Sequence, residues 1–179
     1  MKKSLHKGVT LIETVIYLAL YAILMSGAIL SAYALISTSA RNQTKALAQE
    51  EGNYLIAKID WALTGAKAIN EPNDADPATD DYGTRLSITK YDTSVGDPLV
   101  FVVSGSSISF GRSGDASPPQ ISNSNVTITC PIEGCFRHTS ASGDGINPES
   151  LTATFTITAR TPDGQSYSQD FSTAKYLRK

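Results

Sequence analysis

The hydrophobic pattern changes sharply along the chain, and its first part is an almost uninterrupted apolar run. Residues 9–36 contain a single charged side chain, Glu13, and no proline. A helix of this length rises ~1.5 Å per residue and spans about 42 Å, which exceeds the ~30 Å hydrocarbon core of a bilayer. The sequence therefore predicts a transmembrane or filament-core helix over residues 9–36.

From residue 37 the pattern becomes amphipathic. Small and apolar residues recur at intervals of three and four, which marks one face of a helix. They are Gly52, Leu55, Ile56, Ile59, Ala62, Leu63, Ala66 and Ile69. Because no proline precedes Pro72, we expect one helix from Val9 to Ile69, whose amphipathic half (37–70) packs against a domain.

Residues 71–179 are rich in Ser, Thr, Gly and Asp and show the short alternating runs typical of β-strands. Strands are predicted at 85–91, 99–103, 107–110, 126–130, 151–160 and 167–175. Loops are predicted at 73–83, 112–124 and 137–150. Short turns between successive strands imply an antiparallel sheet with one face on the helix, so the predicted class is α+β with an exported β-rich domain over 71–179.

A short basic segment precedes the apolar run, with Lys2, Lys3 and Lys7 as its charges. The positive-inside rule places this end in the cytoplasm and the C-terminal domain outside it. Three interpretations compete. A cleaved secretory signal has an apolar region of only ~7–15 residues, and a simple single-pass anchor does not explain Glu13. A signal that is cut on the cytoplasmic side of the apolar run explains both the length of this run and the presence of Glu13 within it.

The residues Lys7-Gly8-Val9-Thr10-Leu11-Ile12-Glu13 resemble the type IV prepilin motif. The resemblance implies that residues 1–8 are a leader, that prepilin peptidase cuts between Gly8 and Val9, and that Val9 is N-methylated. It also implies the type IV pilin fold. Glu13 would then be the carboxylate that pairs with the N-terminal ammonium of a neighbouring subunit. The order of elements is similar to that of minor pilins and minor pseudopilins, particularly the pseudopilin class lettered J in type II secretion systems and its pilus relative.

The chain holds two cysteines, Cys130 and Cys135, which flank a turn-like stretch. Two cysteines are too few for a zinc site. In an exported domain they favour a disulfide over two free thiols. The acidic stretch from Asp74 to Asp81 lacks the EF-hand spacing, so a solvated loop is favoured over a calcium site. We therefore expect no metal and no cofactor, and we interpret His138 as a surface residue in a loop.

Charge and motifs narrow the class of function. With 15 basic and 17 acidic side chains the net charge is −2, which gives no basic field for nucleic acid. No nucleophile elbow, phosphate loop or zinc-protease motif is present, so an enzyme is not expected.

The resemblance implies a structural and assembly subunit, a minor pilin or pseudopilin of a type IV pilus or type II secretion-like filament. Its partners would be prepilin peptidase, other pilin subunits and the cytoplasmic (inner) membrane. The assembled subunit would lie at the cell surface or in the periplasm. A DNA-uptake filament stays open as a variant of this class. The alternative is an N-terminally anchored extracytoplasmic binding protein that does not polymerise.

Overall fold

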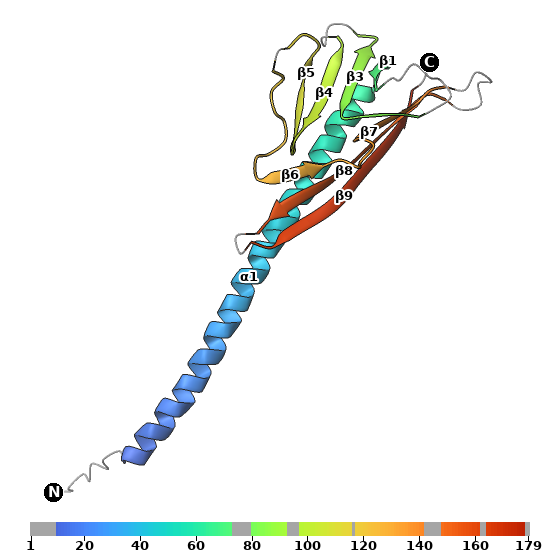
Figure 1. The fold of residues 1–179 in the computed structure, drawn as a ribbon. Coiled ribbons are helices and arrows are strands. Elements are labelled where there is room, and N and C mark those ends of the chain that lie inside the picture. Colours follow the sequence, from blue (N-terminus) through green and yellow to red (C-terminus); the bar gives the residue numbers. More distant parts are fainter. Residues whose placement is uncertain are drawn as a thin grey trace, which may run out of the picture. The chain divides into compact units, whose positions relative to one another are not determined.

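The computed structural model describes residues 10–72, 80–92, 97–115, 117–141, 148–161 and 164–177. These residues form one helix, α1 (Leu11–Leu63), and nine strands in two antiparallel sheets (Figure 1). The chain divides into two compact units, residues 1–42 and 43–179. The first unit holds the N-terminal part of α1, and the second holds the rest of α1 with both sheets. The α+β class predicted from the sequence is confirmed.

The first sheet has four strands in the order β1-β3-β4-β5. Its strands are β1 (Ala66–Glu71), β3 (Arg85–Lys90), β4 (Leu99–Ser104) and β5 (Ser107–Arg112). The strands β3, β4 and β5 follow each other as the predicted meander, with β4 and β5 joined by a hairpin that pairs Ser104 with Ser107. The edge strand β1 follows directly after the helix.

The second sheet has five strands and is built around β8 (Ser150–Arg160). The other members are β2 (Asp81–Gly83), β6 (Val126–Thr129), β7 (Phe136–Thr139) and β9 (Ser166–Tyr176). β9 pairs with β8 along its whole length on one side. On the other side β6 and β7 lie end to end, β6 against residues 156–159 and β7 against residues 150–153. β2 extends the sheet beyond β7.

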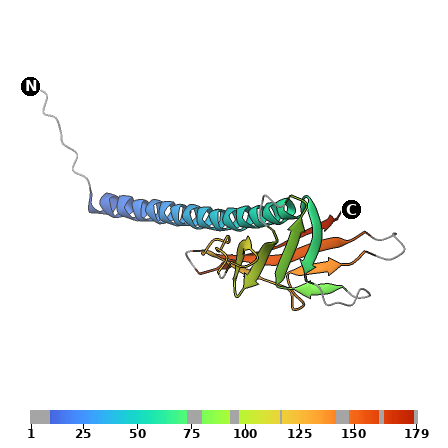
Figure 2. The same cartoon turned by 90° about the horizontal axis from the view of Figure 1, so that it is seen from above.

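One hydrophobic core joins both sheets to the C-terminal part of α1, and Figure 2 shows the strands gathered on one side of this part of the helix. On β8 the predicted alternation is confirmed, because every second side chain is buried. These side chains are Leu151, Ala153, Phe155, Ile157 and Ala159. The helix contributes Ala48, Leu55, Ile59 and Ala62 to the same core, spaced as on one helix face.

The predicted end of the helix, Ile69, is wrong by six residues. α1 ends at Leu63, and Gly65 follows with a φ of 73°, a left-handed conformation that terminates helices. Ala66 and Ile69, which were expected on the helix face, are buried in β1 instead. Their spacing of three suits a helix, but it also occurs in β1 because the register with β3 shifts between Ala66 and Ala68 and again after Ile69.

Three further differences concern the β-rich region. The loop predicted at 73–83 ends in β2, and residues 73–79 lie outside the described part of the chain. The loop predicted at 137–150 begins inside β7. The single sheet expected from the meander is two sheets, since β6 leaves the first sheet and pairs with β8. The two strands missed in the predicted loops, β2 and β7, are short and carry polar residues. They are strands because they pair with neighbouring strands, and the local sequence pattern does not reveal this pairing.

Gly52 provides a notch in α1 for an aromatic ring from β9. A methyl group built at Gly52 would lie 2.1 Å from Cζ of Phe171. Phe171 in turn stacks against Phe155 of β8, with ring centroids 6.1 Å apart. Because position 52 has no side chain, the ring of Phe171 contacts the helix backbone, and β9 packs closely against α1.

The C-terminal end of α1 receives positive charge from both sheets. The last turn of the helix contains no basic residue. Lys90 of β3 donates to the carbonyl oxygen of Trp61 at 3.3 Å, and Lys175 of β9 donates to that of Asp60 at 3.3 Å. Cations are favourable here because the helix dipole leaves partial negative charge on the last carbonyls. The two lysines thus link each sheet to the end of the helix.

Candidate functional site

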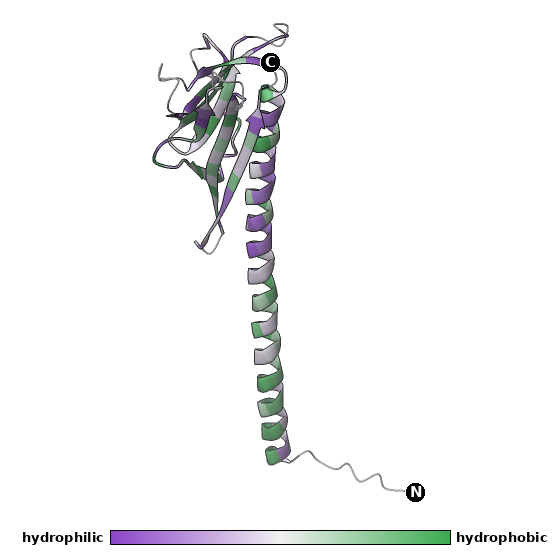
Figure 3. Ribbon diagram, turned by 90° about the vertical axis from the view of Figure 1, so that its right-hand side faces the viewer, coloured by the Kyte–Doolittle hydropathy of each residue, from purple (hydrophilic) through white to green (hydrophobic). Residues whose placement is uncertain are grey.

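Residues 11–36 of α1 are mostly hydrophobic, as the green colouring along this part of the helix in Figure 3 shows. Exposed large apolar residues include Leu11, Ile12, Val15, Ile16, Leu18, Leu20, Ile23, Leu24, Ile29, Leu30, Leu35 and Ile36. By length and composition this helix could cross a membrane. A helix that is apolar all round is stable only when a membrane or other helices surround it.

Glu13 is the exception within this apolar surface. It lies in the first turn of α1, where the helix dipole favours a negative charge. The hydroxyl of Tyr17, one turn further on, donates to Oε1 of Glu13 at 3.3 Å. Among the described residues no cation lies within ion-pair distance of Glu13. One neutral hydrogen bond compensates little of the cost of placing a carboxylate in hydrocarbon, so the site favours a cationic partner.

Hydroxyl groups in the N-terminal unit, within and just after the apolar run, bind carbonyl oxygens of their own helix. Thr14 Oγ1 donates to the carbonyl oxygen of Leu11 at 2.9 Å, Ser26 Oγ to that of Ile23 at 2.9 Å, and Thr38 Oγ1 to that of Ala34 at 2.8 Å. These bonds satisfy each hydroxyl inside the helix. The segment can therefore lie in an apolar medium without an unpaired hydroxyl at these three positions.

The residues of the predicted processing site lie outside the described part of the chain. These are Gly8 and Val9, together with the leader charges Lys2, Lys3 and Lys7. Cleavage and methylation therefore stay predictions. Of the predicted assembly residues the structure places Glu13 alone, on an exposed helix face beside Tyr17.

The structure joins Cys130 and Cys135 in a disulfide, with their Cα atoms 4.8 Å apart. The bridge closes a short excursion between β6 and β7 and keeps the two strands in line along β8. The backbone N–H of Thr154 donates to the carbonyl oxygen of Cys135 at 2.8 Å, which continues the β7 pairing up to the bridge. Both cysteines of the chain are in this bridge, so neither is a free thiol.

His138 is not the surface loop residue expected from the sequence, since it is buried in β7 and only 5% exposed. Its Nε2 lies 3.2 Å from Oε1 of Glu149, and its Nδ1 lies 3.6 Å from Oδ2 of Asp81. The Glu149 carboxylate gives Nε2 a hydrogen-bond partner, whereas Nδ1 and the buried Oδ1 of Asp81 have none among the described residues. Among the described residues no group of three His, Cys, Asp or Glu side chains could hold a metal ion.

Asp80, at the described end of the acidic stretch, binds side chains of β7. Its carboxylate accepts a hydrogen bond from Thr139 Oγ1 at 2.7 Å and forms a salt bridge with Arg137. The hydrogen bond from Thr139, followed by that from Arg137, holds the pKa of Asp80 below its ordinary value of 3.8. The same contact raises the pKa of Arg137. Asp80 therefore fastens the chain before β2 to β7.

Comparisons of the chain with protein-family models, with curated proteins and with solved structures gave no match.

Proposed function

We propose that the chain is a structural and assembly subunit, a minor pilin or pseudopilin, of a type IV pilus or type II secretion-like filament. Prepilin peptidase removes residues 1–8, the apolar part of α1 first resides in the cytoplasmic membrane, and the same segment later packs among the helices of neighbouring subunits. The β-rich unit remains on the extracytoplasmic side.

The observation that carries the proposal is Glu13 on an otherwise apolar, exposed helix. A carboxylate in hydrocarbon costs a few kcal/mol unless it is paired. Cleavage after Gly8 creates an ammonium group at Val9, which is a cation of the required sign close to the same depth of the helix. Pairing Glu13 of one subunit with Val9 of the next neutralises both charges and sets the axial position of the incoming subunit.

The two parts of α1 support different tasks. In the C-terminal part, Leu55 and Ile59 are buried in the core of their own domain. In the N-terminal part, apolar side chains are exposed and are free to contact lipid or another helix. A subunit with this division can keep its own domain folded while its N-terminal segment moves from the bilayer into a filament.

The variant Glu13→Gln tests the pairing. Membrane insertion and leader removal should be unchanged, because the apolar run and Gly8 are intact. The amount of the chain in sheared filaments should fall by roughly tenfold or more, since breaking a buried ion pair costs about 2–5 kcal/mol. Glu50→Gln is the matched control, because Glu50 is exposed on the same helix in the β-rich unit and the chemical change is identical.

Quantitative immunoblotting of filament and membrane fractions distinguishes the outcomes. Loss of Glu13→Gln from filaments, with Glu50→Gln retained, supports the pairing. Equal incorporation of both variants contradicts it. If the wild-type chain itself stays wholly in the membrane fraction while filaments form, the chain is a static anchor and the proposed function fails.

A further inference from the structure

The strand β9 is a long, open edge of the five-stranded sheet. It pairs with β8 over eleven residues, from Arg160 opposite Ser166 to Ser150 opposite Tyr176. Within the described residues no strand pairs with its other side. In Figure 1, β9 forms the outer border of this sheet. An edge of this length exposes a row of backbone hydrogen-bonding groups.

The register shows which residues present these groups. Along an antiparallel strand the backbone groups of successive residues point alternately to one neighbour and to the other. Thr154 of β8 directs its N–H toward Cys135, away from β9, so its partner Ser172 directs its own N–H and C=O toward the open edge. The bond from the N–H of Leu177 to the carbonyl of Glu149 follows the same alternation. The outward residues are Ser166, Ser168, Asp170, Ser172, Ala174 and Tyr176.

These residues are accessible. All six are exposed, and no hydrogen bond connects their outward backbone groups to other described residues. On the solvent-facing side of the sheet three of these side chains bind threonine hydroxyls of β8: Ser172 binds Thr154 at 3.1 Å, Asp170 accepts from Thr156 at 2.6 Å, and Ser168 binds Thr158 at 2.8 Å. The pairing with β8 over eleven residues holds the backbone of this edge in an extended conformation.

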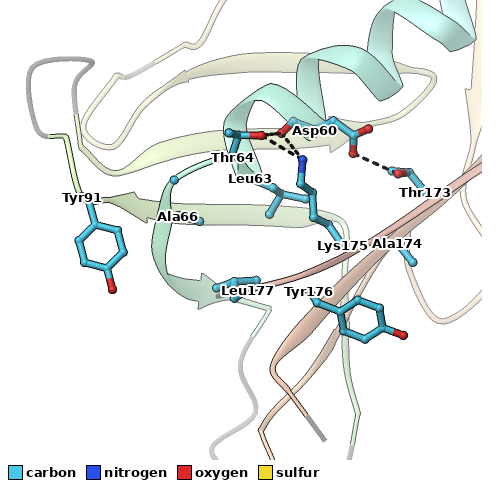
Figure 4. Close-up of a pocket in the computed structure, with 11 residues that line it drawn as sticks. Asp60, Leu63, Thr64, Ala66, Tyr91, Thr173, Ala174, Lys175, Tyr176 and Leu177 are labelled. Carbon is cyan, nitrogen blue, oxygen red and sulfur yellow. Dashed lines mark hydrogen bonds between the residues drawn. The ribbon is translucent and has the colours of Figure 1, made fainter. Parts of the chain in front are cut away.

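A groove of about 750 Å³ lies at the C-terminal end of this edge. Figure 4 shows it between the end of α1, the start of β1 and the last residues of β9. Leu63, Ala66 and Leu177 give it apolar walls, and the exposed rings of Tyr91 and Tyr176 border it. Lys175 is held against the helix by bonds to Thr64 Oγ1 at 3.0 Å and to the carbonyl oxygen of Asp60 at 3.3 Å, so two of its three donors already have acceptors.

We propose that the β9 edge and this groove together bind an extended segment of another protein, which adds to the sheet as a further strand. Only an extended polypeptide offers N–H and C=O groups at the same repeat as the edge, so the occupant is a peptide strand rather than a sugar or a lipid. In strand addition the backbone bonds supply affinity, and pockets for alternate side chains supply specificity.

The two faces of β9 define the chemistry of the segment. Side chains of the added strand that point to the helix side face the groove walls of Leu63, Ala66 and Leu177, so an apolar residue fits there. Side chains on the opposite side continue a face of serine and threonine hydroxyls, so polar residues fit there. The partner segment therefore alternates apolar and polar residues. This proposal does not depend on the proposed filament function.

The first experiment uses the full chain in detergent micelles, panned with a phage-displayed library of random linear dodecapeptides. A selected peptide is synthesised and its affinity is measured by fluorescence anisotropy. Ser172→Pro removes the outward N–H and blocks the added strand, while the ladder to β8 keeps all its donors. We expect the affinity of Ser172→Pro for the peptide to fall by roughly tenfold or more. Ser172→Ala is the matched control, because it also lacks the hydroxyl bond to Thr154 and should bind as the wild type does.

Amide hydrogen exchange on the wild-type chain provides a readout that does not depend on the proline variant folding. Bound peptide should slow exchange at Asp170, Ser172 and Ala174 and leave Phe171 and Thr173 unchanged, since these already donate to β8. The proposal fails if the selected peptides bind Ser172→Pro and the wild type equally. It also fails if the outward amides are protected before peptide is added, or if they become protected only through dimerisation of the chain.

Discussion

Single residues in the β-rich unit connect elements that are distant in sequence, and Gly52 is the sharpest case. Its missing side chain lets the ring of Phe171 contact the helix, although glycine is a poor helix former. The sequence places Gly52 on the buried face of the helix, but the need for glycine there comes from a ring more than a hundred residues further along the chain.

Gly52→Ala should destabilise the β-rich unit by about 1–3 kcal/mol, because the added methyl group overlaps the ring of Phe171 and the core must shift. Helix propensity alone would act in the opposite direction, by ~1 kcal/mol. Chemical denaturation followed by near-ultraviolet circular dichroism measures the difference. Gly27→Ala is the control, since a methyl group there meets no atom within 4 Å. A more stable Gly52→Ala variant would contradict the notch.

Asp80 couples the stability of the β-rich unit to pH. Its pKa is lowered in the folded chain, so its stabilising contribution is present above its ordinary pKa of 3.8 and is lost as the pH falls through the lower folded value. Asp80→Asn should therefore lower Tm at pH 7, and the gap to the wild type should narrow as the pH falls below 3.8 and close below the folded pKa of Asp80.

Thr139→Val refines this prediction because the bond from Thr139 is the largest cause of the lowered pKa. The pKa of Asp80 should move back toward 3.8 in this variant, as measured by carboxyl NMR titration. An unchanged Tm gap across the acid range for Asp80→Asn would show that Asp80 carries no pH-dependent stability.

At the scale of elements, the end of α1 depends on lysines from the two sheets. Lys90 is buried and lies over the ring of Trp61, with Nζ 4.5 Å from its centroid, in addition to its bond to the Trp61 carbonyl oxygen. Lys175 is less buried and binds both Asp60 and Thr64. The two contacts explain how a helix without basic residues in its last turn ends stably at Leu63.

Lys90→Met should lower the free energy of unfolding by about 1–2 kcal/mol, since methionine fills the volume without the charge that faces the helix end. Lys175→Met should cost less, because its site is more exposed. Lys67→Met is the control: Lys67 is exposed on β1, and such surface changes stay within about 0.5 kcal/mol. Urea titrations of the three variants measure the order of their unfolding free energies. A Lys90→Met variant as stable as the wild type would rule out a stabilising role of Lys90 at the end of α1.

At the scale of the whole molecule, the elements that could be predicted are those whose burial follows a local period. The apolar run of α1 and the alternation along β8 each reflect a single environment over many residues, so the pattern alone identifies them. The end of α1 was misplaced because Ala66 and Ile69 continue the helical spacing beyond Gly65, into a strand with irregular register.

The features that escaped prediction depend on tertiary pairing. β7 is short and contains Arg137 and His138, and it is a strand because β8 and β2 pair with it. His138 is buried because every second residue of β7 points inward, as Phe136 and His138 do. The open edge of β9 is also invisible in the sequence, because pairing on one side of a strand leaves no mark in its residue pattern.

For the candidate assembly site, the sequence identifies the residue and the fold does not supply its partner. Glu13 could be singled out from the sequence, because a lone carboxylate in an apolar run is costly and needs a partner. Its cationic partner could not be found among the described residues, where the hydroxyl of Tyr17 donates a hydrogen bond to the Glu13 carboxylate. If the cation belongs to a neighbouring subunit, the folded monomer holds only half of the site.

The most direct test of the central claim is the intact mass and N-terminal sequence of the chain recovered from its native membrane or from sheared filaments. The proposed function predicts a chain that begins at N-methylated Val9. A chain that still begins at Met1 would mean a static anchor, and one that begins near Arg41 would mean an ordinary secreted β-domain; either result would contradict the filament subunit.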